Sequence, residues 1–295
     1  KGLQRLEYRG YDSAGIALIN DSGLTTYKKQ GKVADLESYC EGKDITSSIG
    51  IGHTRWATHG VPNDVNAHPH YSQNKKLAII HNGIIENYDT IKEALVQRGH
   101  IFHSDTDTEV LIHLIEDVKN KGNSSLFEAV RLALNEVIGA YAIAVVSEDS
   151  PEEIIVARMG SPLVVGLGDN EYFIASDATP IVEYTKEVIY LEEGEIAKLS
   201  LSEDVELKTI ENIEKTPFIQ ELELNLEAIE KGGYDHFMLK EIFEQPKSIA
   251  DSIRGRLLSK EGMIKMSGID AYSDKIVNAN RIIIVACGTS WHAGL

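Results

Sequence analysis

The sequence predicts an α+β fold in which antiparallel sheets are stacked with helices on the outside. Segments with strand character follow one another, and pairs of helical segments interrupt them, an order typical of such layered folds. Apolar residues make up 42% of the 295 residues and charged residues 25%, which excludes a disordered or fibrous chain. At this length we expect one large domain or two smaller ones.

The first predicted element is a β-hairpin, because residues 15–19 are apolar, Asn20-Asp21-Ser22-Gly23 is a turn signal and strand character returns at residues 24–27. Short apolar or alternating runs predict further strands. These lie at residues 49–54, 76–81, 140–147, 153–158, 163–167, 171–175 and 189–191. Apolar residues at spacings of three and four predict helices at residues 88–98, 108–120 and 125–137.

A change in character from residue 192 to 226, where acidic and apolar residues alternate, indicates a domain boundary. Beyond it, residues 234–243 and 246–258 are predicted as helices. Residues 281–286 are predicted as an apolar strand that enters Cys287-Gly288-Thr289-Ser290. A second domain therefore begins close to the end of this chain.

Charge and cysteine content exclude several classes of protein. Against 29 Lys and Arg stand 46 Asp and Glu, a formal charge of -17, and such an acidic surface repels nucleic acid. No run reaches the roughly 18 apolar residues of a membrane helix, and the first residues do not resemble a signal peptide. The two cysteines, Cys40 and Cys287, provide neither a disulfide framework nor a CxxC metal pair. We therefore expect a cytoplasmic protein.

The densest group of chemically useful residues is Gly52-His53-Thr54-Arg55-Trp56-Ala57-Thr58-His59-Gly60. It follows a predicted strand and ends at a glycine, as functional loops often do. Arg55 could hold a carboxylate through two parallel hydrogen bonds, and Trp56 could act as a lid. A surface loop with a half-buried tryptophan is an equally good interpretation of the pattern.

Two further groups each allow a functional and a purely structural interpretation. His81-Asn82-Gly83-Ile84-Ile85-Glu86-Asn87 offers an amide donor and an accessible backbone N–H, the parts of an oxyanion hole, but Asn-Gly after a strand is more often a turn. In Ser104-Asp105-Thr106-Asp107-Thr108-Glu109 the carboxylates could bind an ammonium group, but a helix N-cap is the better interpretation of this group alone.

Histidines and a C-terminal loop raise the question of metal and phosphate sites. Seven of the ten histidines lie between His53 and His103, but there is no HExxH motif, and His68-Pro69-His70 lies in a polar loop. We therefore expect hydrogen-bonded or solvated histidines and no metal. The loop at Gly288-Thr289-Ser290 presents N–H groups and hydroxyls that suit a phosphate, although such turns are common.

Taken together, these segments resemble the class II glutamine amidotransferases, and within them the aminosugar branch, the glutamine:fructose-6-phosphate amidotransferases or glucosamine-6-phosphate synthases. The resemblance covers nearly the whole chain. It rests on Arg5-Leu6-Glu7-Tyr8-Arg9-Gly10-Tyr11-Asp12-Ser13-Ala14-Gly15, residues 52–60, 68–70, 81–87 and 106–109, Lys240-Glu241-Ile242-Phe243-Glu244-Gln245-Pro246, and Ala286-Cys287-Gly288-Thr289-Ser290.

The resemblance implies an αββα sandwich, the N-terminal-nucleophile (Ntn) hydrolase fold of a glutaminase, at residues 1–222. It implies a linker at residues 223–245 and the beginning of a parallel-sheet sugar isomerase (SIS) domain at residues 246–295. The implied reaction is glutamine hydrolysis, with the ammonia channelled to fructose 6-phosphate to give glucosamine 6-phosphate. The resemblance implies no cofactor, and the parent enzyme would be a homodimer.

The resemblance also implies roles for single residues. Arg55 would bind the α-carboxylate of glutamine and Asp107 its α-ammonium group, with Thr58 and His59 shaping the pocket. Asn82 and the N–H of Gly83 would form the oxyanion hole. Trp56 would gate the ammonia channel, and Thr289 and Ser290 would hold the phosphate of the sugar.

The sequence departs from the family pattern at one decisive point, because the strand that begins with the nucleophilic cysteine is absent and Lys1 falls within the helix after it. Most of the isomerase domain is also missing. We therefore expect this chain alone to complete neither half-reaction. Two alternatives stay open: a non-catalytic glutamine-binding module of glutaminase fold, and a phosphosugar-binding regulator that uses the second domain.

Overall fold

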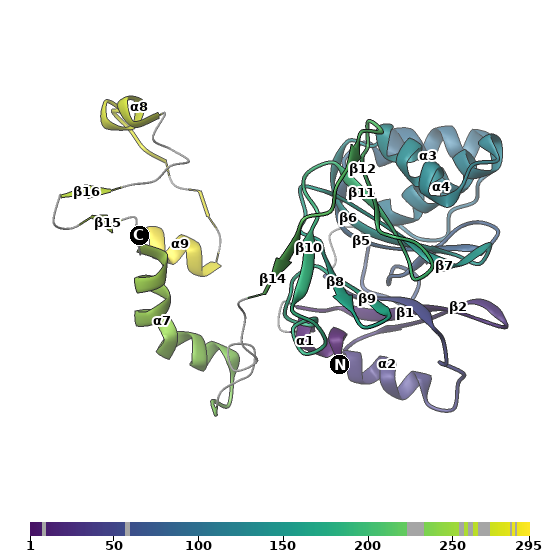
Figure 1. Cartoon of the computed structure of the whole chain (residues 1–295), viewed down its shortest axis with the longest axis horizontal. Helices are drawn as coiled ribbons and strands as arrows, with labels where there is room; N and C mark the ends of the chain where they lie inside the picture. The colour runs from purple at the N-terminus through teal and green to yellow at the C-terminus, as the bar shows by residue number, and fades with distance from the viewer. Residues whose placement is uncertain are drawn as a thin grey trace. The chain divides into compact units, whose positions relative to one another are not determined.

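The computed structural model describes residues 1–7, 10–56, 60–222, 233–253, 257–258, 262–264, 272–283, 285–286 and 288–295. The chain forms two compact units, Lys1–Glu230 and Lys231–Leu295 (Figure 1). No described helix is long and apolar enough to cross a membrane. The candidate site residues 10–107 lie in the first unit, which is a layered sandwich.

The first layer pair consists of a small sheet and a helix beneath it. Helix α1 spans Gly2–Leu6, and strands β1 (Ser13–Asn20) and β2 (Gly23–Gln30) form the predicted hairpin with Asn20 opposite Gly23. Strand β3 (Ile49–Arg55) pairs with the other edge of β1, so the sheet order is β2-β1-β3. Helix α2 (Val33–Cys40) buries Val33, Leu36 and Cys40 against β1.

The central layer is a seven-stranded antiparallel sheet of order β13-β12-β11-β7-β6-β5-β4. Its strands are β4 (His70–Tyr71), β5 (Leu77–Ile85), β6 (Gly139–Ser147), β7 (Ser150–Met159), β11 (Glu195–Ser200), β12 (Glu206–Thr209) and β13 (Glu214–Lys215). Strands β11 to β13 come from the stretch that the sequence marks as a boundary. That stretch reads as polar because Glu195 and Ser200 are polar residues buried within a strand.

Three helices cover the outer face of this sheet: α3 (Tyr88–Gln97), α4 (Asp107–Gly122) and α5 (Leu126–Asn135). Side chains alternate along β6, so Ile143 and Val145 pack against these helices while Ala142 and Ala144 face the other sheet. Small alanines on that inner face allow the two sheets to approach closely. The result is one core between helices and sheet and another between sheets.

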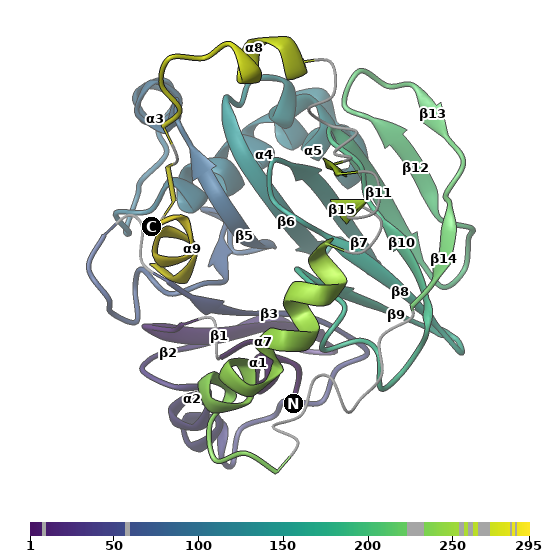
Figure 2. The same ribbon diagram turned by 90° about the vertical axis from the view of Figure 1, so that its left-hand side faces the viewer.

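A third sheet of order β14-β10-β8-β9 extends the inner core. It contains β8 (Val164–Gly168), β9 (Glu171–Ala175), β10 (Glu187–Tyr190) and β14 (Ile219–Glu221). Val165 and Ile189 of this sheet join the core beneath β1 and β3. Figure 2 shows α2, the β1–β3 sheet, the β5–β7 sheet and the α3–α5 helices as successive layers. The predicted αββα sandwich is therefore confirmed.

The second unit differs from the sequence prediction in three places, one of which is residues 257–258, predicted as the end of a helix but found in a short strand. Helix α7 (Phe237–Ile253) is continuous through Pro246, where two helices were predicted, because apolar residues keep their helical spacing on both sides of the proline. The predicted strand at residues 281–286 is wrong for its described residues, which form no regular structure. An apolar run is stable as a strand only when it pairs with another strand. The strand pair described in this unit is formed by β15 (Leu257–Leu258) and β16 (Met263–Ile264) and does not include residues 281–286. Helices α8 (Ser273–Val277) and α9 (Gly288–Gly294) complete the unit.

Candidate active site

Strand β3 places two polar side chains inside the sandwich. Its burial alternates, so that Ile51, His53 and Arg55 point inward. Pairing with β1 sets Arg55 opposite Ser13 and His53 opposite Gly15. The Arg55 side chain is almost completely buried, at 3% exposure of the residue, where a guanidinium group requires charged or polar partners.

Carboxylate groups surround the Arg55 guanidinium. Its Nη1 lies 3.6 Å from Asp12 Oδ1, and its Nη2 donates to the carbonyl oxygen of Gly60 at 3.2 Å. Burial lowers the pKa of Arg55 from its usual value, while the negative charges of Asp12 and Asp107 raise it again. Arg55 and Asp107 therefore lie close enough to interact electrostatically, although 52 positions separate them in the sequence.

Asp107 is the first residue of α4, and the helix begins with a cap. Thr106 is the N-cap, and its hydroxyl accepts from the backbone N–H of Glu109 at 3.3 Å. The predicted helix start is confirmed, with Thr106 in the capping position rather than Ser or Asp. Asp107 Oδ2 accepts from the backbone N–H of Ile85 at 2.8 Å. This hydrogen bond fixes the Asp107 carboxylate beside the end of strand β5.

Asn82 and Gly83 lie within β5, so the interpretation of this Asn-Gly pair as a turn is wrong. The strand continues to Ile85, with Asn82 opposite Ala142 and Gly83 opposite Tyr141. Gly83 has φ +137°, and a Cβ there would lie 2.0 Å from the carbonyl oxygen of Ala140. Only glycine fits this position, because strand β6 approaches so closely that no side chain can be accommodated.

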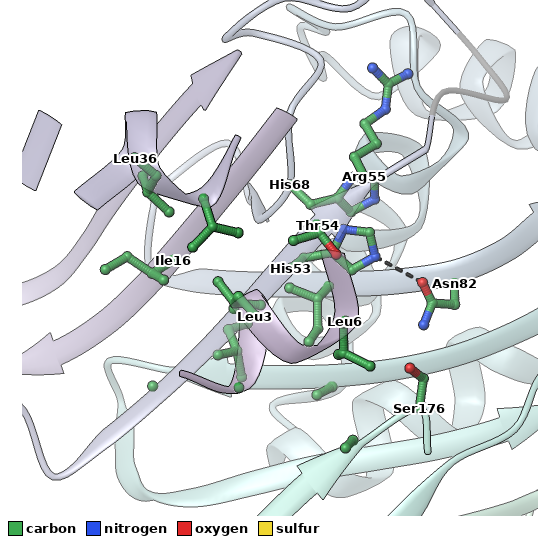
Figure 3. Close-up of a pocket in the computed structure, with 18 of the residues that line it drawn as sticks. Leu3, Leu6, Ile16, Leu36, His53, Thr54, Arg55, His68, Asn82 and Ser176 are labelled. Atoms are coloured by element: carbon green, nitrogen blue, oxygen red, sulfur yellow. Dashed lines mark hydrogen bonds between the residues drawn. The ribbon is translucent and has the colours of Figure 1, made fainter. Parts of the chain in front are cut away.

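His53 holds the side chain of Asn82, a role that the sequence did not indicate. His53 Nε2 lies 2.9 Å from Asn82 Oδ1, and because an amide oxygen only accepts, Nε2 carries the proton. Burial lowers the pKa of His53 to about 4, so the imidazole is neutral at pH 7. Figure 3 shows the amide nitrogen of Asn82 on the side away from His53. The two-residue spacing of His53 and Arg55 along a strand was the available signal.

A cavity of about 1170 Å³ brings the candidate residues together. Arg55, Asn82, Gly83 and Asp107 all line it, and Figure 3 shows its apolar wall, which includes Leu3, Ile16 and Leu36. Trp56 also lines the cavity. It is 69% exposed, so the prediction of a half-buried tryptophan in a surface loop is wrong. A cation, a carboxylate and amide donors in one cavity can bind a zwitterion and stabilise an oxyanion.

Hydrogen bonds between buried imidazoles and hydroxyls connect the elements that carry the site residues. Thr108 Oγ1 lies 3.0 Å from both His68 Nε2 and His81 Nδ1, and Thr106 Oγ1 lies 3.1 Å from His70 Nε2. Hydrogen-bonded histidines were expected, but His68 and His70 are buried rather than part of a solvated loop. This network connects β4, β5 and the first turn of α4.

Other predicted residues lie outside the described part of the chain or in the second unit, and Cys40 lines the cavity from helix α2. Thr58 and His59 lie outside the described residues, as does Cys287. Thr289 and Ser290 belong to the short helix α9 of the second unit. Cys40 is buried at the end of α2, and burial raises the pKa of its thiol while Lys43 opposes the effect. Such a thiol is a poor nucleophile at neutral pH.

Fold and cavity together define a glutamine amidotransferase of the Ntn type, and the chain belongs to this family: residues 34–235 match the model described as "Glutamine amidotransferase domain". More particularly, it is 59% identical to the glutamine–fructose-6-phosphate aminotransferase (isomerizing) of Bacteroides thetaiotaomicron and 54% identical to that of Chlorobaculum tepidum. All of this chain aligns with 48% of each relative, so it spans about half their length.

A solved structure supports the same fold. The glutamine phosphoribosylpyrophosphate amidotransferase of B. subtilis superposes with a TM-score of 0.61 and 32% identity, over 71% of this chain and 45% of that one. The resemblance stated from the sequence is therefore confirmed for the family and the sandwich fold. This superposition does not show the parallel-sheet isomerase domain expected at residues 246–295.

Proposed function

We propose that this chain is the glutamine-hydrolysing part of an enzyme that makes glucosamine 6-phosphate from glutamine and fructose 6-phosphate. One observation carries the proposal. A buried arginine and a buried aspartate, Arg55 and Asp107, lie beside Asn82 and Gly83 in a single cavity. The relatives that align with the whole chain are named for this reaction.

In this proposal the opposite charges of Arg55 and Asp107 hold the two ends of the amino acid head group. The Arg55 guanidinium would bind the α-carboxylate of glutamine through parallel hydrogen bonds, and the Asp107 carboxylate would bind its α-ammonium group. Thr58 and His59 would shape the rest of the pocket. Because both charges are withdrawn from water, they discriminate strongly against ligands that lack either group.

The side-chain amide of glutamine would then lie beside Asn82 and Gly83. Attack at its carbonyl carbon places negative charge on the oxygen, and Asn82 Nδ2 and the Gly83 N–H would donate to it. His53 occupies Asn82 Oδ1, so the nitrogen end of that amide is free to face the substrate. The donors are in place before the reaction, which avoids reorganisation in the transition state.

The nucleophile in this proposal is the thiol of an N-terminal cysteine of the complete gene product. Cys40 is unsuited, because burial disfavours its thiolate. An N-terminal cysteine carries its own base, an α-amine with a pKa of about 8. The thiolate attacks the δ-carbon of glutamine, ammonia leaves with the proton, and water hydrolyses the glutamyl thioester to glutamate.

The sugar half-reaction would use the second part of the complete protein. Residues 223–245 would form a linker and residues 246–295 the start of the isomerase domain, with Thr289 and Ser290 on the phosphate of fructose 6-phosphate. Trp56, exposed at the cavity wall, would gate the passage of ammonia. The complete enzyme would be a cytoplasmic homodimer that binds neither membrane nor nucleic acid.

The test is an assay of the complete gene product, with its mass and N-terminal residue determined first. We expect a protein that begins with cysteine and forms glutamate and glucosamine 6-phosphate in equal amounts from glutamine and fructose 6-phosphate. Glutamate formation without any aminosugar would overturn the sugar half of the proposal. Saturable glutamine binding without hydrolysis would establish the binding module instead.

A further inference from the structure

Three side chains with metal-binding atoms meet on the outer helical layer, away from the cavity. His113 and Glu116 lie one turn apart on α4, and His100 follows helix α3. A Schellman turn sets the position of His100: its N–H donates to the carbonyl of Leu95, and the N–H of Gly99 donates to that of Val96. Gly99 has φ +92°, as this motif requires.

The spacing of the three side chains suits a metal ion. The metal-binding atoms of His100, His113 and Glu116 all lie within 4.8 Å of one another. The two Nδ1 atoms are 3.1 Å apart, and His100 Nδ1 is 4.0 Å from Glu116 Oε2. Two imidazole nitrogens on one tetrahedral zinc ion lie about 3.3 Å apart. The Glu116 carboxylate lies farther out, so its oxygen must move inward for all three donors to share one ion.

A carboxylate lies near the Nε2 atom of each imidazole, and outer partners of this kind orient the histidine ligands of metal sites. His113 Nε2 lies 4.0 Å from Glu109 Oε1, and His100 Nε2 lies 3.8 Å from Asp117 Oδ1. Protons on both Nε2 atoms would leave both Nδ1 atoms for a metal ion, in place of the hydrogen bond that joins them at 3.1 Å. Two acidic side chains behind neutral ligands raise the basicity of those ligands and favour a cation.

The ligand Glu116 and the supporting carboxylate Asp117 are themselves held by the protein. Glu116 accepts from the backbone N–H groups of Gln73 and Asn74, at 3.0 and 2.9 Å. Asp117 Oδ2 accepts from Arg98 at 2.6 Å and from Lys121 at 2.8 Å. These contacts tie two loops to α4 around the three side chains, so the cluster is pre-organised rather than a chance gathering on a flexible surface.

Packing holds His113 in one place. It is 1% exposed, and its ring stacks on that of Phe102 with centroids 4.7 Å apart. The His100 side chain is 10% exposed, so it is the histidine of the cluster that is nearer to solvent.

We propose that His100, His113 and Glu116 bind a divalent transition-metal ion, with Zn²⁺ the best fit, and that water completes its coordination. Two nitrogens and one oxygen form a borderline donor set that suits zinc better than calcium or magnesium. The sequence did not predict the site, because its ligands are 13 and 3 positions apart and match no metal motif. The ion would fasten the loop after α3 to α4.

The experiment is a titration of the metal-free complete gene product with Zn²⁺ by calorimetry, and with Co²⁺ by visible absorption. We expect one equivalent of metal, with the absorption bands of four-coordinate Co²⁺. His100→Ala is the main variant because the side chain is near the surface, and we expect its affinity to fall at least about 100-fold. Glu116→Gln is expected to weaken binding about tenfold or more.

His103→Ala is the matched control, since His103 is an exposed histidine of the same loop outside the three-ligand cluster, and we expect wild-type binding. The absence of saturable binding in the wild type would overturn the proposal and leave a direct hydrogen bond between His100 and His113. Binding that His100→Ala leaves unchanged, or a cobalt–thiolate charge-transfer band, would overturn it by placing the metal elsewhere.

Discussion

His53 donates its Nε2–H to Asn82 Oδ1 across 2.9 Å, from the inner face of one sheet to a strand of the next. A neutral histidine has a single proton to give, so this hydrogen bond sets both the tautomer of His53 and the orientation of the Asn82 amide. In the proposed function Asn82 is the oxyanion donor, and its amide is therefore oriented by His53. We regard His53 as a positioning residue.

Replacing His53 is expected to impair turnover rather than binding. In His53→Ala the Asn82 amide loses its fixed orientation, and we expect kcat for glutamine hydrolysis by the complete enzyme to fall about 100-fold, the usual effect of losing one oxyanion donor. KM for glutamine should change less than threefold, because Arg55 and Asp107, the proposed ligands of the head group, are unchanged. Steady-state kinetics with a glutamate assay measures both constants.

His53→Gln provides the control, because its side-chain amide can donate to Asn82 Oδ1 in place of the imidazole. We expect it to recover at least part of the lost kcat. A variant pair in which both substitutions raise KM and leave kcat intact would show that His53 shapes the binding pocket instead.

Gly83→Ala should destabilise the sandwich. Its Cβ would overlap the carbonyl oxygen of Ala140 at 2.0 Å, and its φ of +137° is also strained for alanine. Gly99→Ala is a matched control with φ +92° and no atom within 4 Å of the added Cβ. We expect Gly99→Ala to cost about 1–3 kcal/mol of unfolding free energy and Gly83→Ala clearly more, measured by urea unfolding. Equal losses would contradict the close approach of β6.

Thr108→Val removes one hydroxyl at nearly constant volume. That hydroxyl contacts both His68 Nε2 and His81 Nδ1 at 3.0 Å, so the change removes one hydrogen-bond contact from each of two buried imidazoles. We expect a loss of about 1–3 kcal/mol. Thr90→Val on the exposed surface of α3 should change stability by less than about 0.5 kcal/mol. A similar loss of unfolding free energy in the two variants would contradict a stabilising role of the Thr108 hydrogen bonds.

Buried histidines should make stability fall on acidification. Burial lowers the pKa of His53 to about 4 and those of His68 and His70 well below the ordinary 6.5. The unfolded chain therefore takes up protons below pH 6.5 that the folded chain does not. The stabilisation is complete above pH 6.5 and is lost as the pH falls towards 4, by about 1.4 kcal/mol per pH unit for each imidazole.

Unfolding free energies measured at pH 7.0, 6.0 and 5.0 check this dependence before most carboxylates titrate. His53→Gln should reduce the slope by the contribution of one proton. A stability that stays level over this range would contradict neutral, buried imidazoles at these positions.

Local signals in the sequence predicted much of the sandwich but missed elements that depend on tertiary packing. The hairpin at Asn20 and Gly23 and the helix after Thr106 were predictable, because turn and cap residues act on their own neighbours. Strand β11 was not, since Glu195 and Ser200 are polar yet buried by tertiary packing. The Asn82-Gly83 pair looked like a turn because only the approach of β6 makes glycine necessary inside a strand.

The candidate site shows the same division. Arg55 and Asp107 could be selected by residue type and by resemblance, whereas their proximity depends on how β3 and α4 meet. His53 drew no prediction because its role is defined by a hydrogen bond to a different sheet. The cluster of His100, His113 and Glu116 was hidden for a similar reason, because a turn after α3 brings His100 back to α4.

Substrate analogues paired with variants of Asp107 test the central claim most directly. The complete gene product is assayed with L-glutamine and with glutaramic acid, which lacks only the α-amino group. Asp107→Asn keeps an oxygen that can accept from the Ile85 N–H but loses the charge. Asp105→Asn, a change at an exposed neighbour, is the control and should behave as wild type.

If Asp107 binds the α-ammonium group, Asp107→Asn will lower kcat/KM for L-glutamine at least about 30-fold, which corresponds to about 2 kcal/mol of lost transition-state stabilisation. The same variant will change kcat/KM for glutaramic acid less than threefold. An equal loss with both substrates would contradict the account, because it would show that Asp107 supports the fold of α4 and does not recognise glutamine.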